Sequence, residues 1–379
     1  MAHLDPGATA LVDHHCHGVI PGDLDRAAFE GFLTEAFDPA PEGTSYFDTP
    51  VGLAVRRWCA PVLDLPPLAS PDAYLTRRAE LGAEEVHRRL LRSAGLEAVL
   101  VETGHLGGEL LGPAAMGRLA AAPAHQVVRL ETVAEAVARQ GVDAAAYPDA
   151  FARALAAAAA DAVGLKTAVA YRGGFGLDPA RPEAGEVVDA AGRWLSRLEV
   201  SRLEDPVLLR HAIWTGAELG RDRGLPLQVH AGYGDPDLTL HLANPSLLTD
   251  LVRALVRLPV TVVFLHCYPY HREAAHLAAV FPHVYFDVGL ALHYTGPGAG
   301  RVLAEAMELA PFTKQLYSSD GFALAEFHFL GALRFRRGLA AILEEWVRRE
   351  ECSAADADRI ADLLGRANAH RIYRLDDGR

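Results

Sequence analysis

The sequence lacks several features that assign proteins to common classes. Its 379 residues include four cysteines without a Cys-x-x-Cys pair, which suits a reducing compartment better than a disulfide-stabilised secreted protein. No apolar run approaches the ~20 residues that span a bilayer, and no basic region followed by an apolar segment marks a signal peptide at the amino terminus. Acidic residues outnumber basic residues, and the formal net charge of −13 disfavours an anionic partner. We therefore expect a soluble cytoplasmic protein that binds neither nucleic acid nor membranes.

The absence of two motifs argues against one type of catalysis and one type of fold. There is no Gly-x-Ser-x-Gly, and neither Cys16 nor Cys267 has a spare histidine to act as a base, so covalent catalysis is disfavoured. No Gly-x-Gly-x-x-Gly turn follows the first apolar run, which argues against a doubly wound dinucleotide-binding sheet.

Apolar, strand-like runs alternate with helical patterns along most of the chain, and half of the residues are hydrophobic. The runs are continuous rather than alternating, as expected for parallel strands covered on both faces. Eight runs fit this description: residues 10–17, 98–104, 126–131, 163–170, 226–232, 261–266, 284–289 and 315–320.

Eight strand–helix units predict an α/β protein with one (β/α)₈ TIM barrel domain over residues 1–379. The length beyond a minimal barrel is not evenly spread. We expect a helical insertion at about residues 18–95, after the first strand, that caps the mouth of the active site. We expect a helical carboxyl-terminal tail over residues 322–379.

Ionisable residues fall near the carboxyl ends of these runs, where barrel enzymes build their active sites. His15 and His17 stand one residue apart, so in an extended chain both side chains point to the same side and can converge on one cation. Neutral histidine is a common ligand of zinc and similar metals. Further candidates in later runs are Lys166, His230, His266 and Asp320. Burying so many ionisable groups at one place would be costly without a cation.

This set of residues, in this strand order, resembles the metal-dependent amidohydrolase superfamily. The stretches at residues 164–172, 229–235 and 266–273 look like the amidohydrolase-related branch that forms the amino-terminal domain of glutamine synthetase fusion proteins, and the chain is too short to include a synthetase part. The resemblance implies one or two divalent ions, zinc first among them, and hydrolysis of an amide C–N bond by activated water. It implies that Asp320 moves the proton, while His230 and His266 complete the metal shell or stabilise the oxyanion.

Lys166 stands in an otherwise apolar run, where an isolated buried ammonium group would be penalised. In one interpretation carbon dioxide adds to the neutral amine, and the resulting carbamate bridges two metals. In the other the amine pairs with a carboxylate such as Glu102 or Asp320, and the site holds one metal. We favour the carbamate, because the superfamily places such a ligand on its fourth strand.

Candidate substrate-binding residues lie at or just beyond the same runs: Glu102, Tyr171, Arg172, Asp235, Tyr268 and Arg272. Either arginine could hold a carboxylate through a bidentate fork, and Asp235 could hold an ammonium group. Glu102 either contacts a ligand or stabilises a loop. These groups suit a small, carboxylate-bearing, amino-acid-like substrate such as a γ-glutamyl amide.

Several alternatives stay open at this stage. We expect His14, Cys16 and Cys267 to be structural and His328 to be structural or on the surface, while Asp287 is either structural or catalytic. A single-metal decarboxylase of the same superfamily and a catalytically inactive metal-binding barrel are the rival functions. We expect a small-molecule substrate, and assembly as a homo-oligomer is left open.

Overall fold

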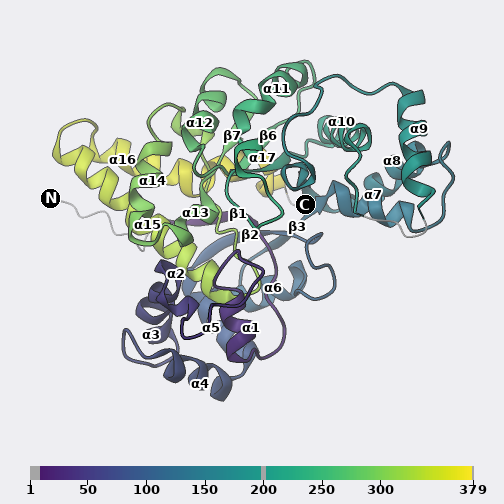
Figure 1. Cartoon of the computed structure of the whole chain (residues 1–379). Helices are drawn as coiled ribbons and strands as arrows, with labels where there is room; N and C mark the ends of the chain where they lie inside the picture. Colours follow the sequence, from purple (N-terminus) through teal and green to yellow (C-terminus); the bar gives the residue numbers. More distant parts are fainter. Residues whose placement is uncertain (1–8, 198–201, 378–379) are drawn as a thin grey trace.

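The computed structural model describes residues 9–197 and 202–377. Within these residues one parallel sheet contains seven strands that follow one another in sequence order. They are β1 (Leu11–Cys16), β2 (Leu96–Glu102), β3 (Ala124–Arg129), β4 (Ala162–Thr167), β5 (Leu227–Ala231), β6 (Val262–His266) and β7 (Val284–Phe286). Helices surround the strands (Figure 1). This is the α/β barrel-like arrangement that the alternating pattern predicts.

The eighth predicted strand is not a regular strand. Residues 315–320 form a single isolated bridge, between Gln315 and Phe286. Their backbone still contacts both edges of the sheet, because Leu316 N donates to Phe286 O at 3.0 Å and His14 N donates to Tyr317 O at 3.2 Å. The backbone contacts on the β1 side continue further, since Asp320 N donates to His15 O at 3.1 Å and His17 N donates to Gly321 O at 2.7 Å. Asp320 itself has a φ of 48°, outside the extended region.

Most of the other predicted elements are present, with shifted ends. Helix α10 (Pro206–Arg223) begins after Asp205, whose side chain accepts hydrogen bonds from the first-turn N–H groups. The same helix ends at Gly224, whose φ of 66° suits glycine. The run predicted at 163–170 stops earlier, because residues 169–172 form a 3₁₀ turn.

Five helices lie between β1 and β2 and gather at the bottom of Figure 1. They are α1 (Arg26–Gly31), α2 (Pro50–Ala54), α3 (Ala60–Val62), α4 (Pro71–Leu81) and α5 (Ala83–Ala94). A π-helical turn, Val55–Cys59, joins α2 to α3. The helices between β2 and the segment at 315–320 are α6 (Pro113–Ala120), α7 (Leu130–Ala138), α8 (Tyr147–Ala158), α9 (Ala184–Leu195), α10, α11 (Thr249–Leu255), α12 (His271–Val280), α13 (Gly289–Tyr294) and α14 (Ala299–Ala306).

The predicted helical tail consists of α15 (Ala325–Arg348), α16 (Ala354–Asp362) and α17 (Asn368–Tyr373). Helix α15 packs against α5 and α14. Ile372 and Tyr373 of α17 pack in a buried cluster with residues such as Val12, Val163 and Val263, which lie near the amino ends of their strands. Helix α17 therefore covers the amino-terminal end of the curled sheet, and the carboxyl-terminal end is left for a site.

No helix of the described residues is both long enough and apolar enough to cross a membrane.

A buried ion pair joins the helices after β1 to the tail. Arg78 of α4 and Glu326 of α15 lie 2.7 Å apart with side chains 5% and 1% exposed, and Tyr74 Oη also donates to Glu326 at 2.7 Å. Removing one partner of such a pair leaves a buried charge without its counterion, which is more costly than losing an exposed pair.

We expect Arg78→Met to lower the free energy of unfolding by about 3–5 kcal/mol. The matched control is Arg253→Met, because Arg253 pairs with Asp250 at a surface where the two side chains are 63% and 71% exposed; this change should cost less than about 1 kcal/mol. Urea denaturation of both variants measures the difference. Equal losses would show that the Arg78–Glu326 pair does not anchor these helices to the tail.

Candidate metal centre and active site

A cavity of about 640 Å³ opens at the carboxyl ends of the strands. The cavity is lined from the carboxyl ends of β1, β3, β4 and β5 by His17, Arg129, Lys166 and His230. Asp320 reaches it from the irregular segment at residues 315–320, which lies beside both β7 and β1. Residues from the loop after α1, including Phe32 and Glu35, line it from another side. The cavity is therefore where the strand-end pattern predicts an active site.

The carboxylate of Asp320 lies at the centre of three histidines. Its Oδ1 is 3.2 Å from His15 Nε2 and 3.6 Å from His17 Nε2, and its Oδ2 is 3.3 Å from His266 Nε2. One potential ligand atom from each of His15, His266 and Asp320 lies within 4.8 Å of the others. The His230 ring centroid is 4.9 Å from that of His266, so the fourth histidine borders the same point. The structure thus brings these predicted metal ligands together.

The protonation and bonding of these groups fit a cation. Burial lowers the pKa of His15, His230 and His266, which favours the neutral imidazole that binds metals. Among the described residues, His230 Nε2, His266 Nε2 and Asp320 Oδ1 are buried without a hydrogen-bond partner. Buried polar atoms without partners are costly, and a divalent ion would satisfy several of them at once.

A buried hydrogen-bond network fixes which nitrogen of His15 is free. Gln228 Nε2 donates to His14 O at 2.9 Å and to Tyr373 Oη at 2.8 Å, so its Oε1 accepts from His15 Nδ1 at 2.8 Å. Nδ1 of His15 therefore carries the proton, and the lone pair of Nε2 is free to accept from Lys166 Nζ or to bind an ion held beside Asp320.

Asp287 is a structural carboxylate, which resolves the alternative left open above. It accepts from His14 Nε2 at 3.0 Å, from the backbone N–H of His266 at 3.0 Å and from Ser318 Oγ at 2.8 Å. These bonds hold His266, a predicted metal ligand, and the segment that contains Ser318, and they give His14 the structural role that we expected.

Lys166 directly contacts His15, one of the predicted metal ligands. Its Nζ lies 2.9 Å from His15 Nε2, and the lysine is 3% exposed. Burial, with Arg129 nearby, lowers the pKa of Lys166 to about 8, and Glu102 and Asp320 oppose this shift. The carboxylates of Glu102 and Asp320 influence the amine electrostatically, but neither forms an ion pair with it in the described part of the chain.

Glu102 supports the site from behind and does not line the cavity. Its Oε2 accepts from Arg129 Nη2 at 2.5 Å and lies 3.4 Å from His17 Nδ1. Its Oε1 accepts from the backbone N–H of Gly104. This geometry supports a role for Glu102 in stabilising the loop after β2 rather than in contacting a ligand.

Three of the predicted substrate-binding residues line the cavity: Tyr171, Arg172 and Asp235. The Tyr171 ring lies 4.6 Å from that of His230 between centroids. Arg172 Nη2 bonds Glu135 at 3.3 Å, whereas its Nε and Nη1 are buried without a partner among the described residues. Burial raises the pKa of Asp235.

Arg272 and Tyr268 do not line the cavity, which corrects the sequence-based assignment. Helix α12 begins at His271, and its half-exposed Arg272 pairs with Glu308, just after the end of α14, at 2.8 Å. Tyr268 stacks on His271 with 5.9 Å between ring centroids. The sequence shows that Arg272 follows a strand, but it does not show whether the helix that begins there points this side chain into the cavity or away from it.

The cavity also contains residues that the sequence analysis missed: Glu35, His105, Arg129, Arg202, His293 and Tyr294. Arg129 ends β3, so the strand-end rule could have found it. His105 lies three residues after β2, and its ring is 5.6 Å from that of His17. Glu35 comes from the segment between β1 and β2, and burial raises its pKa to about 7. No local pattern marks that residue.

Comparison with known proteins places this geometry in a family. A family model described as Amidohydrolase matches residues 105–375. Protein fluG of Emericella nidulans is 26% identical in an alignment of 403 positions, gaps included, that covers 97% of this chain and 46% of fluG, so the chain spans about half the length of this curated relative.

Two solved structures illustrate the similarity of fold. A protein of Lactobacillus casei ATCC 334, provisionally named a metal-dependent hydrolase, has a TM-score of 0.83 and 28% identity over 98% of this chain and 96% of its own. Uronate isomerase of Thermotoga maritima has a TM-score of 0.65 over 97% and 95% of the two chains, but at 13% identity it shares the fold alone. Since the family model covers most of the chain and the histidines and Asp320 meet at the strand ends, this protein belongs to the amidohydrolase family.

Proposed function

We propose that this protein is a metal-dependent hydrolase that cleaves the amide C–N bond of a small, carboxylate-bearing, amino-acid-like molecule. The observation that carries the proposal is the convergence of buried, neutral histidines on Asp320 at the floor of a cavity that also contains arginines. His15, His17, His230, His266 and Asp320 would hold one or two divalent ions, with zinc proposed because nitrogen ligands dominate the set.

A divalent ion held by these ligands lowers the pKa of water from ~15.7 toward ~7 and polarises a carbonyl group. Asp320 would accept the proton of the attacking water, because its Oδ1 is buried and has no hydrogen-bond partner among the described residues. It would then pass that proton to the departing nitrogen. His230 would face the developing oxyanion, and the adjacent Tyr171 ring limits how far its imidazole can turn.

Arginines in the cavity support a carboxylate-bearing substrate. In the described part of the chain, Arg129 Nε, Arg172 Nε and Nη1, and Arg202 Nε are buried without partners. A substrate carboxylate can accept from such N–H groups in a bidentate manner. Asp235 and Glu35 line the same cavity and can receive an ammonium group, so an α-amino acid moiety, as in a γ-glutamyl amide, matches both kinds of charge.

The activity test is a screen of metal-loaded protein against γ-glutamyl amides, other N-acyl amino acids, lactones and aromatic carboxylic acids. Amine or ammonia release from the amides supports the proposal. Carbon dioxide release from an acid would instead identify the decarboxylase alternative. Metal binding without turnover of any compound would identify an inactive barrel.

Asp320→Asn should lower kcat by about 10²–10⁴-fold on the best amide, because the asparagine amide cannot accept the proton. Some metal should remain, since the amide oxygen can still coordinate. Steady-state kinetics and elemental analysis measure the two effects. The control, Asp250→Asn, changes an exposed aspartate of α11 and should have no effect. A near-normal kcat in Asp320→Asn would remove Asp320 from the role of base.

Arg172→Met should raise KM, or lower kcat/KM, for anionic substrates by roughly 10–100-fold, as expected for losing a hydrogen bond between charged groups. Neutral analogues should lose much less. Arg272→Met is the matched control, because that arginine is paired with Glu308 outside the cavity. Equal losses for anionic and neutral substrates would show that Arg172 acts only through its contact with Glu135.

We propose that Lys166 is carboxylated and bridges two ions, since its nitrogen already lies beside a ligand atom of His15. Protein loaded with metal in ¹³C-bicarbonate should show a carbamate carbonyl signal by NMR. Lys166→Gln should lack the signal and bind one ion fewer than wild type. An unlabelled lysine in fully metal-loaded wild-type protein would establish the alternative, an unmodified amine beside a single ion.

A further inference from the structure

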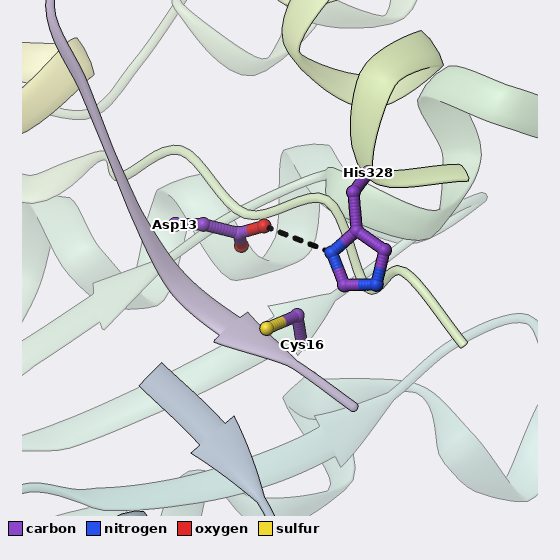
Figure 2. Close-up of side chains that lie close together, drawn as sticks. All are labelled: Asp13, Cys16 and His328. Atoms are coloured by element: carbon purple, nitrogen blue, oxygen red, sulfur yellow. Dashed lines mark ion pairs between the residues drawn. The ribbon is translucent and has the colours of Figure 1, made fainter. Parts of the chain in front are cut away.

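A second cluster of potential ligands lies on β1, apart from the cavity. Asp13 and Cys16 of β1 and His328 of α15 approach one another (Figure 2), and all three are 0% exposed. One potential ligand atom from each lies within 4.8 Å of the other two. None of the three lines the cavity, so the cluster is not a part of the site described above.

The ring of His328 makes no hydrogen bond within the described part of the chain. Both of its ring nitrogens are buried without a hydrogen bond to any other residue that the structure describes. Burial lowers the pKa of His328 to about 3, so the ring is neutral and keeps a lone pair. The ring packs on Gly321, where a Cβ atom would lie 2.6 Å from its Cδ2 and Cγ atoms. This glycine thus leaves room for the imidazole beside Asp13 and Cys16.

Asp13 is already oriented toward His328. Its Oδ1 accepts from the backbone N–H of Ser319 at 2.8 Å, and its Oδ2 accepts from the Ser319 hydroxyl. Asp13 Oδ2 lies 4.0 Å from His328 Nδ1, too far for a hydrogen bond. Zinc binds nitrogen and oxygen at roughly 2.0–2.2 Å, so two ligands of one ion can lie up to ~4 Å apart. The separation suits an ion between the two groups.

We propose that Asp13, Cys16 and His328 form a second, structural metal site, distinct from the active site, for a thiophilic divalent ion such as Zn²⁺. Sulfur and imidazole ligands select such ions over Mg²⁺ and Ca²⁺. On binding, the Cys16 thiol would lose its proton to solvent and ligate as a thiolate. The present Cys16 contact, a thiol donating to Leu100 O at 3.6 Å, is a weak bond that costs little to give up.

Such an ion would join segments that regular sheet pairing leaves loosely connected. It would tie β1 to α15 and, through the bonds between Asp13 and Ser319, to the irregular segment that precedes Asp320. These are the segments that carry His15, His17 and Asp320. The second ion would therefore hold the active-site ligands in place without touching the substrate.

Cobalt provides the test, because thiolate-to-cobalt charge transfer absorbs in the near ultraviolet, while the active-site ligands include no cysteine. The full chain, as a Cys352→Ser variant to remove the partly exposed thiol, is produced in cobalt-supplemented medium. Its cobalt content and absorption spectrum are then measured. We expect the charge-transfer absorption in this parent protein, retained in Asp320→Asn.

Cys16→Ser should lose the absorption, and both Cys16→Ser and His328→Gln should bind one cobalt ion fewer than the parent. Cys59→Ser and Cys267→Ser, which change two other fully buried cysteines, are matched controls and should keep the absorption. If Cys16→Ser does not fold, the absorption spectrum of the parent and the cobalt content of His328→Gln still test the proposed site. A cobalt-saturated parent without the absorption, or its loss in Asp320→Asn or in either control, would overturn the proposal.

Discussion

The rest of the active site depends on the burial of neutral histidines around one carboxylate. Asp320 lies 3.2 Å from His15 Nε2 and 3.3 Å from His266 Nε2, in an interior where buried atoms of these groups have no partner among the described residues. A folded chain tolerates such an arrangement only if something compensates for the lost hydration, and a divalent ion does so with few atoms. The surrounding structure holds these side chains in that orientation.

A polar network beneath the site provides part of that support and links it to the carboxyl-terminal tail. Tyr373 of α17 accepts from Gln228 and contacts His14, which in turn donates to Asp287. Gln228 fixes the tautomer of His15, and Asp287 holds the backbone of His266. The tail helix, far from the cavity in sequence, thereby determines which ring nitrogen reaches the centre.

The lining of the cavity comes from two parts of the chain. The cavity combines side chains at strand ends, such as Arg129, with residues from the segment between β1 and β2, such as Glu35. The first group is attached to the sheet and is positioned with the metal ligands. The second comes from a connection that can vary without disturbing the strands, which is how one barrel fold serves many substrates.

The sequence by itself predicted the strand order, the barrel-like class and the meeting of His15, His17, His230, His266 and Asp320 at one end of the sheet. These follow from local rules, because continuous apolar runs mark buried parallel strands, and residues at their carboxyl ends must meet at one end of the sheet. Only the tertiary structure decided what lies beyond the strands. It separated Arg172, inside the cavity, from Arg272, on an outward-facing helix. It also brought His328 beside Asp13 and Cys16 across more than 300 positions, because helix packing depends on contacts between distant segments that no local pattern encodes.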